Sequence, residues 1–147
     1  MLSQTVEYAL RAMVCLAAAD PHPQTRSELV EQTRVPSAYL AKVMRELGRR
    51  HLVEAQRGRH GGFRLSRPAG EISLLHVVDA VEPLQRIRTC PLEIDWHGTS
   101  LCPLHRRLDD ILLTAEQALA SCTLADIVRE RSGSIPLCRE QPLVELS

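Results

Sequence analysis

The hydrophobic positions at the start of the chain recur every three to four residues. Between residues 3 and 19 they form one stripe, which consists of Val6, Leu10, Met13, Val14 and Ala17. This period predicts an α-helix with one buried face. A proline-containing breaker at residues 20–23 ends it. Thr25 and Glu28 then have the form of a capping box, which predicts a short helix over residues 27–32.

A second amphipathic stretch follows a tight turn at residues 33–35. Pro36 suits the first turn of a helix, where no amide proton is needed, and this helix is predicted to reach about residue 50. Its buried stripe is Leu40, Val43, Met44 and Leu47. A rotation of about 100° per residue leaves on the opposite face Ala38, Lys42, Arg45 and Arg49. The helix therefore has one apolar side and one basic side.

The hydrophobic period then shortens to two. Apolar and polar residues alternate over 52–57 and 63–67, which predicts two short strands. Gly58-Arg59-His60-Gly61-Gly62 between them suits the tip of a β-hairpin, because glycine permits positive φ angles. A nucleotide-binding loop is disfavoured, since neither a Lys-Ser/Thr pair nor a helix follows these glycines.

The second half of the chain has one long amphipathic stretch. A short helix is predicted over 74–81, and residues 84–102 have no clear period. A helix is predicted over 103–121, with a stripe of Leu108, Ile111, Leu112, Ala115, Ala118, Leu119 and Cys122. So small a chain offers little surface to cover this stripe, which favours pairing with a second copy over packing on the first helix. A last short helix is predicted over 123–131.

This order of elements predicts a mainly α fold with a small β-hairpin. It corresponds to a winged helix-turn-helix domain followed by a long dimerisation helix. The expected units are a DNA-binding domain over 1–82, a cysteine-containing sensor loop over 83–102, the dimerisation helix and a short helix over 103–131, and a tail over 132–147.

The net charge of zero hides an asymmetry. Residues 1–70 contain eleven Lys and Arg against six Asp and Glu, whereas residues 71–147 contain seven against twelve. A basic segment in a neutral protein is typical of a nucleic-acid contact surface. The residues expected to contact double-stranded DNA are Arg26, Ser37, Ala38, Tyr39, Lys42, Arg45, Arg49, Arg57, Arg59 and His60. The basic outer face disfavours a helix-turn-helix used only for protein contacts.

The apolar runs and the cysteine content bear on the cellular compartment of the protein and on its chemistry. The longest uncharged apolar run, residues 12–19, is too short for a membrane span and does not resemble a signal peptide, which favours a cytoplasmic protein. Five cysteines, an odd number, favour thiol or metal chemistry over a disulfide framework.

Four motifs in this order resemble the Rrf2-type (IscR/NsrR-like) family of transcriptional regulators. They are EYALRA at 7–12, PSAYLAKV at 36–43, RGRHGGFRL at 57–65 and ISLLHVVDAVE at 72–82. The resemblance covers roughly residues 1–125. It implies a homodimeric regulator that binds a pseudo-palindromic operator, usually as a repressor, and that dimerises through the long helix.

The resemblance also implies ligands for a cluster. Cluster-binding members carry three cysteines, each separated by five residues, before the dimerisation helix. Cys90 and Cys102 match the outer two, and Trp96 stands at the middle position. His105 matches a ligand of one branch, and Glu7 matches a ligand that another branch takes from the other subunit. The implied ligands of a [2Fe–2S] cluster are therefore Cys90, Cys102, His105 and Glu7.

The cysteine loop leaves other chemistry open. Thiolates suit iron–sulfur clusters, but two thiolates, a histidine and a carboxylate also suit tetrahedral zinc. The missing middle cysteine is also compatible with a metal-free regulator that responds through thiols. A small enzyme with Cys102 as nucleophile and His105 or His97 as base is disfavoured, because no third group is evident to orient the base.

Overall fold

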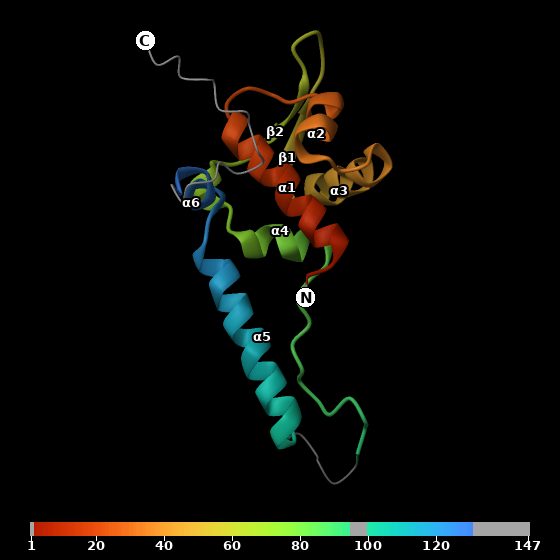
Figure 1. The fold of residues 1–147 in the computed structure, drawn as a ribbon, viewed down its shortest axis with the longest axis vertical. Helices are drawn as coiled ribbons and strands as arrows, with labels where there is room; N and C mark the ends of the chain where they lie inside the picture. Colours follow the sequence, from red (N-terminus) through yellow and green to blue (C-terminus); the bar gives the residue numbers. More distant parts are fainter. Residues whose placement is uncertain (1, 95–99, 131–147) are drawn as a thin grey trace, which may run out of the picture.

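The computed structural model describes residues 2–94 and 100–130. Its elements are α1 (Gln4–Ala19), α2 (Arg26–Thr33), α3 (Ser37–Arg49), β1 (Val53–Gln56), β2 (Gly62–Leu65), the 3₁₀ helix η1 (Ala69–Glu71), α4 (Leu74–Val81), α5 (Pro103–Ser121) and α6 (Leu124–Arg129). The described chain is mainly helical with one antiparallel hairpin, which confirms the predicted fold class. Figure 1 shows α5 projecting away from the group formed by the other elements.

The local signals set the helix boundaries. Ser3 caps α1, and the predicted capping box of Thr25 and Glu28 is present at α2. Arg34 adopts a left-handed conformation, with φ of 56°, and ends α2. Pro36 is the residue that precedes α3 rather than its first helical residue. The bounds of α4 and α5 agree with the predicted ranges.

The hairpin is shorter than predicted, and it has an additional neighbour. Its strands pair Val53 with Leu65 at the base and Gln56 with Gly62 near the tip. Phe63 also exchanges two backbone hydrogen bonds of 2.8 Å with Gln24, so the segment before α2 borders the second strand. Only the base of the hairpin is buried, which leaves its outer half free to project from the molecule.

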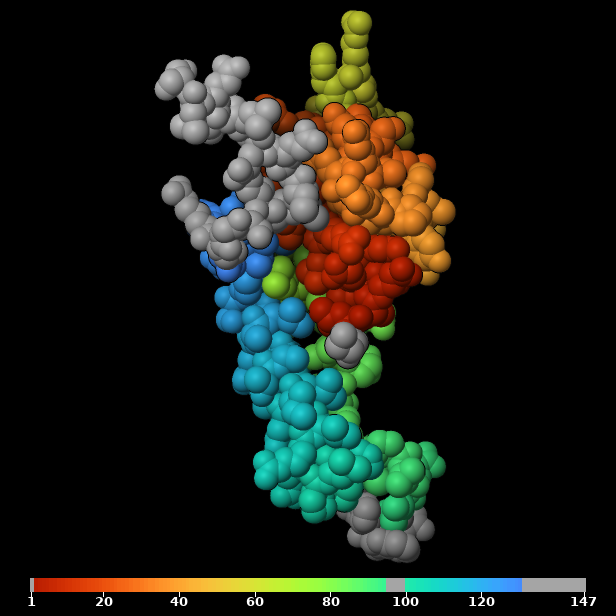
Figure 2. Space-filling view, in the orientation of Figure 1, coloured from red at the N-terminus to blue at the C-terminus, as the bar shows by residue number. Residues whose placement is uncertain are grey.

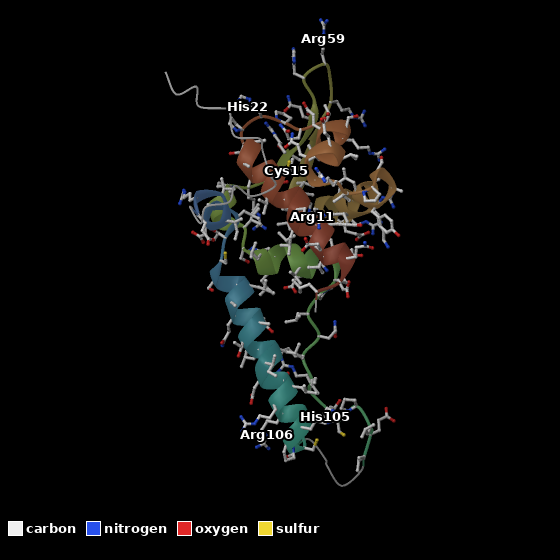
Figure 3. The ribbon with its side chains drawn as sticks, in the orientation of Figure 1. Arg11, Cys15, His22, Arg59, His105 and Arg106 are labelled. Carbon is white, nitrogen blue, oxygen red and sulfur yellow. The ribbon has the colours of Figure 1, made fainter. Side chains whose placement is uncertain are left out.

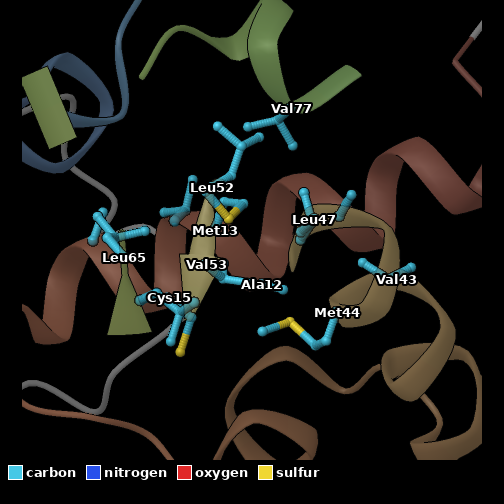
Figure 4. Packing of buried hydrophobic residues seen from close by; sticks show 14 of the residues in the cluster. Ala12, Met13, Cys15, Val43, Met44, Leu47, Leu52, Val53, Leu65 and Val77 are labelled. Carbon is cyan, nitrogen blue, oxygen red and sulfur yellow. The ribbon is translucent and has the colours of Figure 1, made fainter. Parts of the chain in front are cut away.

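The core forms around α1. Ala9, Ala12 and Met13 on this helix are fully buried, and the apolar stripe of α3 packs against it. Figure 4 shows Leu47 and Met44 of α3 facing α1 beside Leu52 and Val77. The predicted buried face of α3 is thereby confirmed, and the polar face of the same helix is directed to solvent.

The short last helix, α6, is part of the same core. Leu124 is fully buried, and α6 packs on α1 and η1. Its N-terminal residue donates a backbone hydrogen bond of 2.9 Å to Ile72, while Leu74 donates one of 2.9 Å to Cys122. These bonds attach the C-terminal end of α5 to the start of α4.

The long helix α5 leaves its apolar residues uncovered. None of its residues is buried, although it packs on α4. Leu104, Leu108 and Ile111 are 62%, 42% and 64% exposed. Figure 2 shows α5 and the hairpin tip protruding at opposite ends of the molecule. Among the described helices, none has the length and apolar character needed to span a membrane.

Candidate functional site

The outward face of α3 is polar and basic. Its first turn exposes Ser37, Ala38 and Tyr39, and its later turns expose Lys42, Arg45 and Arg49. Within residues 2–94 and 100–130, no ion pair neutralises Lys42 or Arg45. Arg49 differs from these two, because its Nη1 lies 3.1 Å from Oε1 of Glu46. Lys42 and Arg45 are therefore two cations without an ion-pair partner among the described residues, and they lie on the face predicted to contact DNA.

The hairpin tip presents a second set of positive charges. Arg57, Arg59 and His60 are all exposed there, and Figure 3 shows Arg59 at the outermost end of the hairpin. A Cβ at Gly61 would collide with the carbonyl of Gln56, and Gly62 has a φ of 148°. These two positions therefore require glycine if the tip is to hold this shape.

Arg26 lies at the start of α2 and is also exposed. All ten residues predicted to contact DNA are thus exposed to solvent. They belong to α2, α3 and the hairpin, which occupy the half of the molecule away from α5 (Figure 1). Helix α3 and the adjacent β-hairpin are therefore both available to contact DNA.

A side-chain network joins α1 to this surface. Arg11 contacts Glu7 at 3.0 Å, and its Nη1 donates a hydrogen bond of 3.4 Å to the carbonyl of Thr33. The guanidinium also lies 5.8 Å from the ring centre of Tyr8, which meets Tyr39 edge to face at 5.8 Å. The spacing of Glu7 and Arg11 by four residues predicts their pairing, but the contacts with Thr33 and Tyr39 have no sequence signal.

At the other end of the molecule, a cysteine and a histidine meet. Cys102 is the N-cap residue of α5, and Pro103 is its first helical residue. Sγ of Cys102 lies 3.2 Å from Nδ1 of His105, one helical turn later. A thiolate and an imidazole are ligands for zinc and for iron–sulfur clusters. The pair is thus a potential half of a ligand set.

The other two predicted ligands complete no metal-binding group in the described part of the chain. Cys90 is buried, and Glu7 is exposed on α1, where it pairs with Arg11. The described residues contain no group of three or more histidine, cysteine or acidic side chains arranged to hold a metal ion. Trp96 and His97 fall outside the described residues. The described residues therefore bring together Cys102 and His105, and they form no group of three or more ligands with Cys90 or Glu7.

A half-buried ion pair fixes the chain that leads to Cys90. Arg86 donates two hydrogen bonds of 2.7 Å to the carboxylate of Asp109 on α5, and both side chains are 16% exposed. The amide of Ile87 adds a hydrogen bond of 2.9 Å, and Glu116 lies 3.6 Å from the same arginine. The hydrogen bonds from Arg86 lower the pKa of Asp109 to about 2. Sequence reasoning missed this contact, because nothing local relates positions 86 and 109.

The remaining cysteines have structural surroundings. Cys15 is buried in the core, and its Sγ donates to Oε1 of Gln32 at 3.0 Å. Cys122 lies at the end of α5, where burial raises the pKa of its thiol. Cys138 falls outside the described residues. Cys15 therefore belongs to the core.

Together, the helix-turn-helix, the glycine-tipped hairpin and the basic face define a winged-helix DNA-binding regulator. The model of the Rrf2 family, described as an iron-dependent transcriptional regulator, matches residues 2–130. The chain belongs to the Rrf2 family of transcriptional regulators. This membership confirms the family resemblance of the four motifs.

Solved structures show the same fold. CymR, the global cysteine regulator of B. subtilis, superposes with a TM-score of 0.73 at 22% identity, over 86% of this chain and 95% of that chain. T. potens IscR gives a TM-score of 0.73 at 22% identity, over 87% and 85%. The oxidised form of S. aureus CymR gives 0.70 at 22% identity, over 89% and 98%. These likenesses show that the chain has the fold of these proteins.

Proposed function

We propose that the protein is a homodimeric transcriptional repressor that binds double-stranded operator DNA. The observation that carries this proposal is the exposed cationic face of α3 beside the arginine-bearing hairpin tip. In this proposal DNA binding belongs to residues 1–82, sensing to the loop at 83–102, and dimerisation to the helix within 103–131. The family membership supports the DNA partner.

The proposed DNA contacts divide by element. Helix α3 enters the major groove with Ser37, Ala38 and Tyr39 in its first turn, where the small side chain of Ala38 leaves room for close approach. Lys42 and Arg45 reach base edges or phosphates. Arg57, Arg59 and His60 on the hairpin reach the backbone or the adjacent minor groove. Arg26 and Arg49 contact flanking phosphates. Most of this affinity is electrostatic and therefore salt-dependent.

The uncovered face of α5 supports the homodimer. Leu104, Leu108 and Ile111 follow one another at helical spacing and are all exposed in the protomer. Exposed apolar side chains at this spacing are typical of a helix that pairs with another helix. A symmetric pairing would bury the same stripe on both copies and would present two DNA-binding units to the two halves of one operator.

The proposed sensor is a [2Fe–2S] cluster at the N-terminus of α5. The contact between Cys102 and His105 fits this group, since soft thiolate and imidazole donors lie together at an accessible helix end. Cys90 would supply a second thiolate, and Glu7 of a second copy would complete the set. When bound, such a cluster supplies sensitivity to redox state, nitric oxide or iron–sulfur status.

The network at Glu7 would connect this sensor to DNA. A glutamate that leaves Arg11 to serve as a ligand would remove one partner of that guanidinium. Arg11 also contacts the carbonyl of Thr33, in the turn before α3, and the ring of Tyr8, which touches Tyr39. The position of α3 would therefore respond to whether Glu7 is a ligand.

A second candidate is the same regulator without a cluster, responding through thiols or a bound zinc ion. It is favoured by the fact that the described residues of one protomer place no third donor beside Cys102 and His105. An ultraviolet-visible spectrum, with iron, sulfide and zinc analysis of protein purified without oxygen, separates the two candidates. Equimolar iron and sulfide with visible absorption supports the cluster, whereas a colourless, iron-free protein that binds its operator excludes it.

DNA binding is tested by a gel-shift titration against genomic fragments at fixed salt, with the mass in solution measured by light scattering. We expect a dimer that retards specific fragments at low ionic strength. A monomer that binds no duplex under these conditions would refute the proposal, whatever the cysteine loop holds.

A further inference from the structure

The segment between α4 and α5 is held to α5 by one cluster of polar contacts. Arg86 and Asp109 form the two parallel hydrogen bonds described above, and the amide of Ile87 donates a third to the same carboxylate. A charge-assisted bidentate pair is stronger and more directional than a single hydrogen bond. These three bonds therefore fix which residue of the segment faces which turn of the long helix.

Figure 1 shows the direction in which this segment runs. After α4 the chain passes beside α5 toward the end at which α5 begins. The ion pair marks a contact with the second turn of α5, at Asp109. Glu116 lies on the same face of the helix two turns later, and its Oε2 is 3.6 Å from Nη1 of Arg86. Residues that follow Ile87 therefore approach the N-terminus of α5, where Cys102 is the N-cap residue.

The lengths of chain on the two sides of this contact match. An α-helix rises about 1.5 Å per residue, so Cys102 lies about 10 Å from Asp109 along the axis of α5. Cys90 is the third residue after Ile87, and an extended chain covers about 10 Å over that length. Residues 83–90 are not helical, so no helical turn shortens the segment. With Ile87 bonded to Asp109, an extended segment brings Cys90 level with Cys102.

The exposure of the segment distinguishes Cys90 from its neighbours. It is the only buried residue between positions 82 and 94, and it is not part of the core around α1. The amide of Glu93 donates a hydrogen bond of 3.1 Å to the carbonyl of Cys90, so the chain turns directly after this cysteine. The thiol is therefore turned toward the protein at the point where the segment ends its course along α5.

The register depends on the ion pair because the segment is long. About twenty residues connect α4 to α5, and a flexible loop of that length samples many positions. Two thiols on such a loop meet less often than two thiols held at the same level of a helix. Loss of the bidentate contact would therefore separate Cys90 from Cys102 on average without removing either residue.

We propose that Arg86 and Asp109 are positioning residues, which set the register of the cysteine segment against α5 so that Cys90 stands level with Cys102 and His105. As a part of the sensor this inference rests on the proposed function, whereas the register itself belongs to the metal-free chain. The ion pair supplies no ligand. It places the second thiol of the proposed ligand set before any metal or cluster is bound.

The test measures how often a short bifunctional maleimide bridges Cys90 and Cys102 in the full-length protein, freed of metal by a chelator. Each thiol adds across one maleimide double bond and nothing is released. A bridge therefore adds one reagent molecule, whereas separate reactions add two. Residues 89–106 form one tryptic peptide in which these are the only cysteines, so its mass distinguishes the two products. Their ratio reports proximity and does not depend on how fast the first thiol reacts.

We expect the ratio of bridged to separate product to fall at least threefold in Asp109→Asn and in Arg86→Gln. Asp110→Asn is the matched control, because it removes the same charge from an adjacent exposed residue that has no ion pair within the described residues, and its ratio should equal that of wild type. Exchange of the charges, Arg86→Asp together with Asp109→Arg, should restore the ratio to within twofold of wild type. A general loss of stability would not be restored in this way.

Three results would overturn the proposal. One is an equal ratio in Asp109→Asn and Asp110→Asn, and another is a ratio that rises in Asp109→Asn, because the pair would then hold the thiols apart. The third is a wild-type ratio in Arg86→Lys, which keeps the charge but cannot donate two parallel hydrogen bonds. This variant tests the geometry even if Asp109→Asn folds poorly. None of these measurements uses iron or DNA, so a protein without a cluster, or one that binds no duplex, refutes the proposed function and leaves the register unaffected.

Discussion

Replacement of Arg59 by glutamine tests whether the hairpin tip follows the DNA backbone. Arg59 is exposed at the outer end of the hairpin and has no acidic partner in the described residues. Each phosphate contact contributes about 0.9 to the slope of log affinity against log salt. Two protomers that lose one contact each should therefore reduce the slope of a dimer by about 1.8.

The same geometry provides a matched control. Arg64 lies on the same hairpin and is also exposed, but the carboxylate of Glu54, its cross-strand partner, already neutralises it. Arg64→Gln should therefore change the salt slope much less than Arg59→Gln. Both variants lose one positive charge, so a general effect of net charge would change both slopes equally.

The assay is fluorescence anisotropy of a labelled duplex between 50 and 200 mM KCl. Over this fourfold range, a slope difference of about 1.8 makes wild-type affinity fall about twelvefold more than that of Arg59→Gln. Equal slopes for wild type and Arg59→Gln would show that the tip does not contact phosphate. Equal losses in Arg59→Gln and Arg64→Gln would show that charge alone, rather than position, determines the effect.

Four further predictions concern the recognition helix, the core, the linker and the sensor. Lys42→Ala should weaken operator binding severalfold at fixed salt, because this exposed lysine has no internal partner; an unchanged gel-shift titration would remove it from the interface. Leu47→Ala should lower the free energy of unfolding by about 2–5 kcal/mol in urea denaturation, because Leu47 is fully buried in the core. Asp109→Asn should lower the melting temperature at pH 7. The folded-state pKa of Asp109, about 2, lies below its usual value of 3.8, so the ionised carboxylate stabilises the fold fully above about pH 4 and this stabilisation is lost as the pH falls to about 2. The difference in melting temperature between wild type and Asp109→Asn should therefore narrow over this interval. Glu7→Gln should shift the visible absorption bands of anaerobically purified protein, and identical spectra would exclude Glu7 as a ligand.

Local signals in the sequence predict most of the fold. The stripe of α3 has the period that a half-buried helix requires, and it is buried in the structure. The stripe of α1 is buried except for Leu10, which is partly buried, and burial of α1 extends beyond the predicted stripe to residues such as Cys15 and Leu16. Thr25 and Glu28 mark a helix start because their hydrogen bonds involve only four consecutive residues. The glycines at 58, 61 and 62 mark the hairpin for the same local reason.

Contacts between distant positions have no such signal. The ion pair of Arg86 with Asp109 and the edge-to-face contact of Tyr8 with Tyr39 each depend on how two elements pack. The docking of Leu124 into the core is of the same kind, because the periodicity of α6 does not indicate which surface it covers. Such contacts follow from tertiary packing, which no short window of sequence encodes.

The candidate site also contains some features that the local sequence predicts and others that it does not. The basic face of α3 and the charges of the hairpin tip follow from the helical period and the turn residues, so their exposure is predictable. The contact of Cys102 with His105 is also local, since the two residues are one helical turn apart. A ligand taken from a second copy, as proposed for Glu7, is a property of the dimer and cannot be read from the periodicity of one chain.

Packing connects the two ends of the molecule through α4. His105 and the hairpin tip lie at opposite ends of the structure (Figure 3), and α5 packs on α4. The short helix in turn packs on both α1 and α3, so a shift of α5 reaches the recognition helix through it. The backbone bonds of Leu74 with Cys122 and of Leu124 with Ile72 hold the C-terminal end of α5 against this same place. Because that end is fixed, a change at Cys102 would move the free end of α5 about an anchor beside α4.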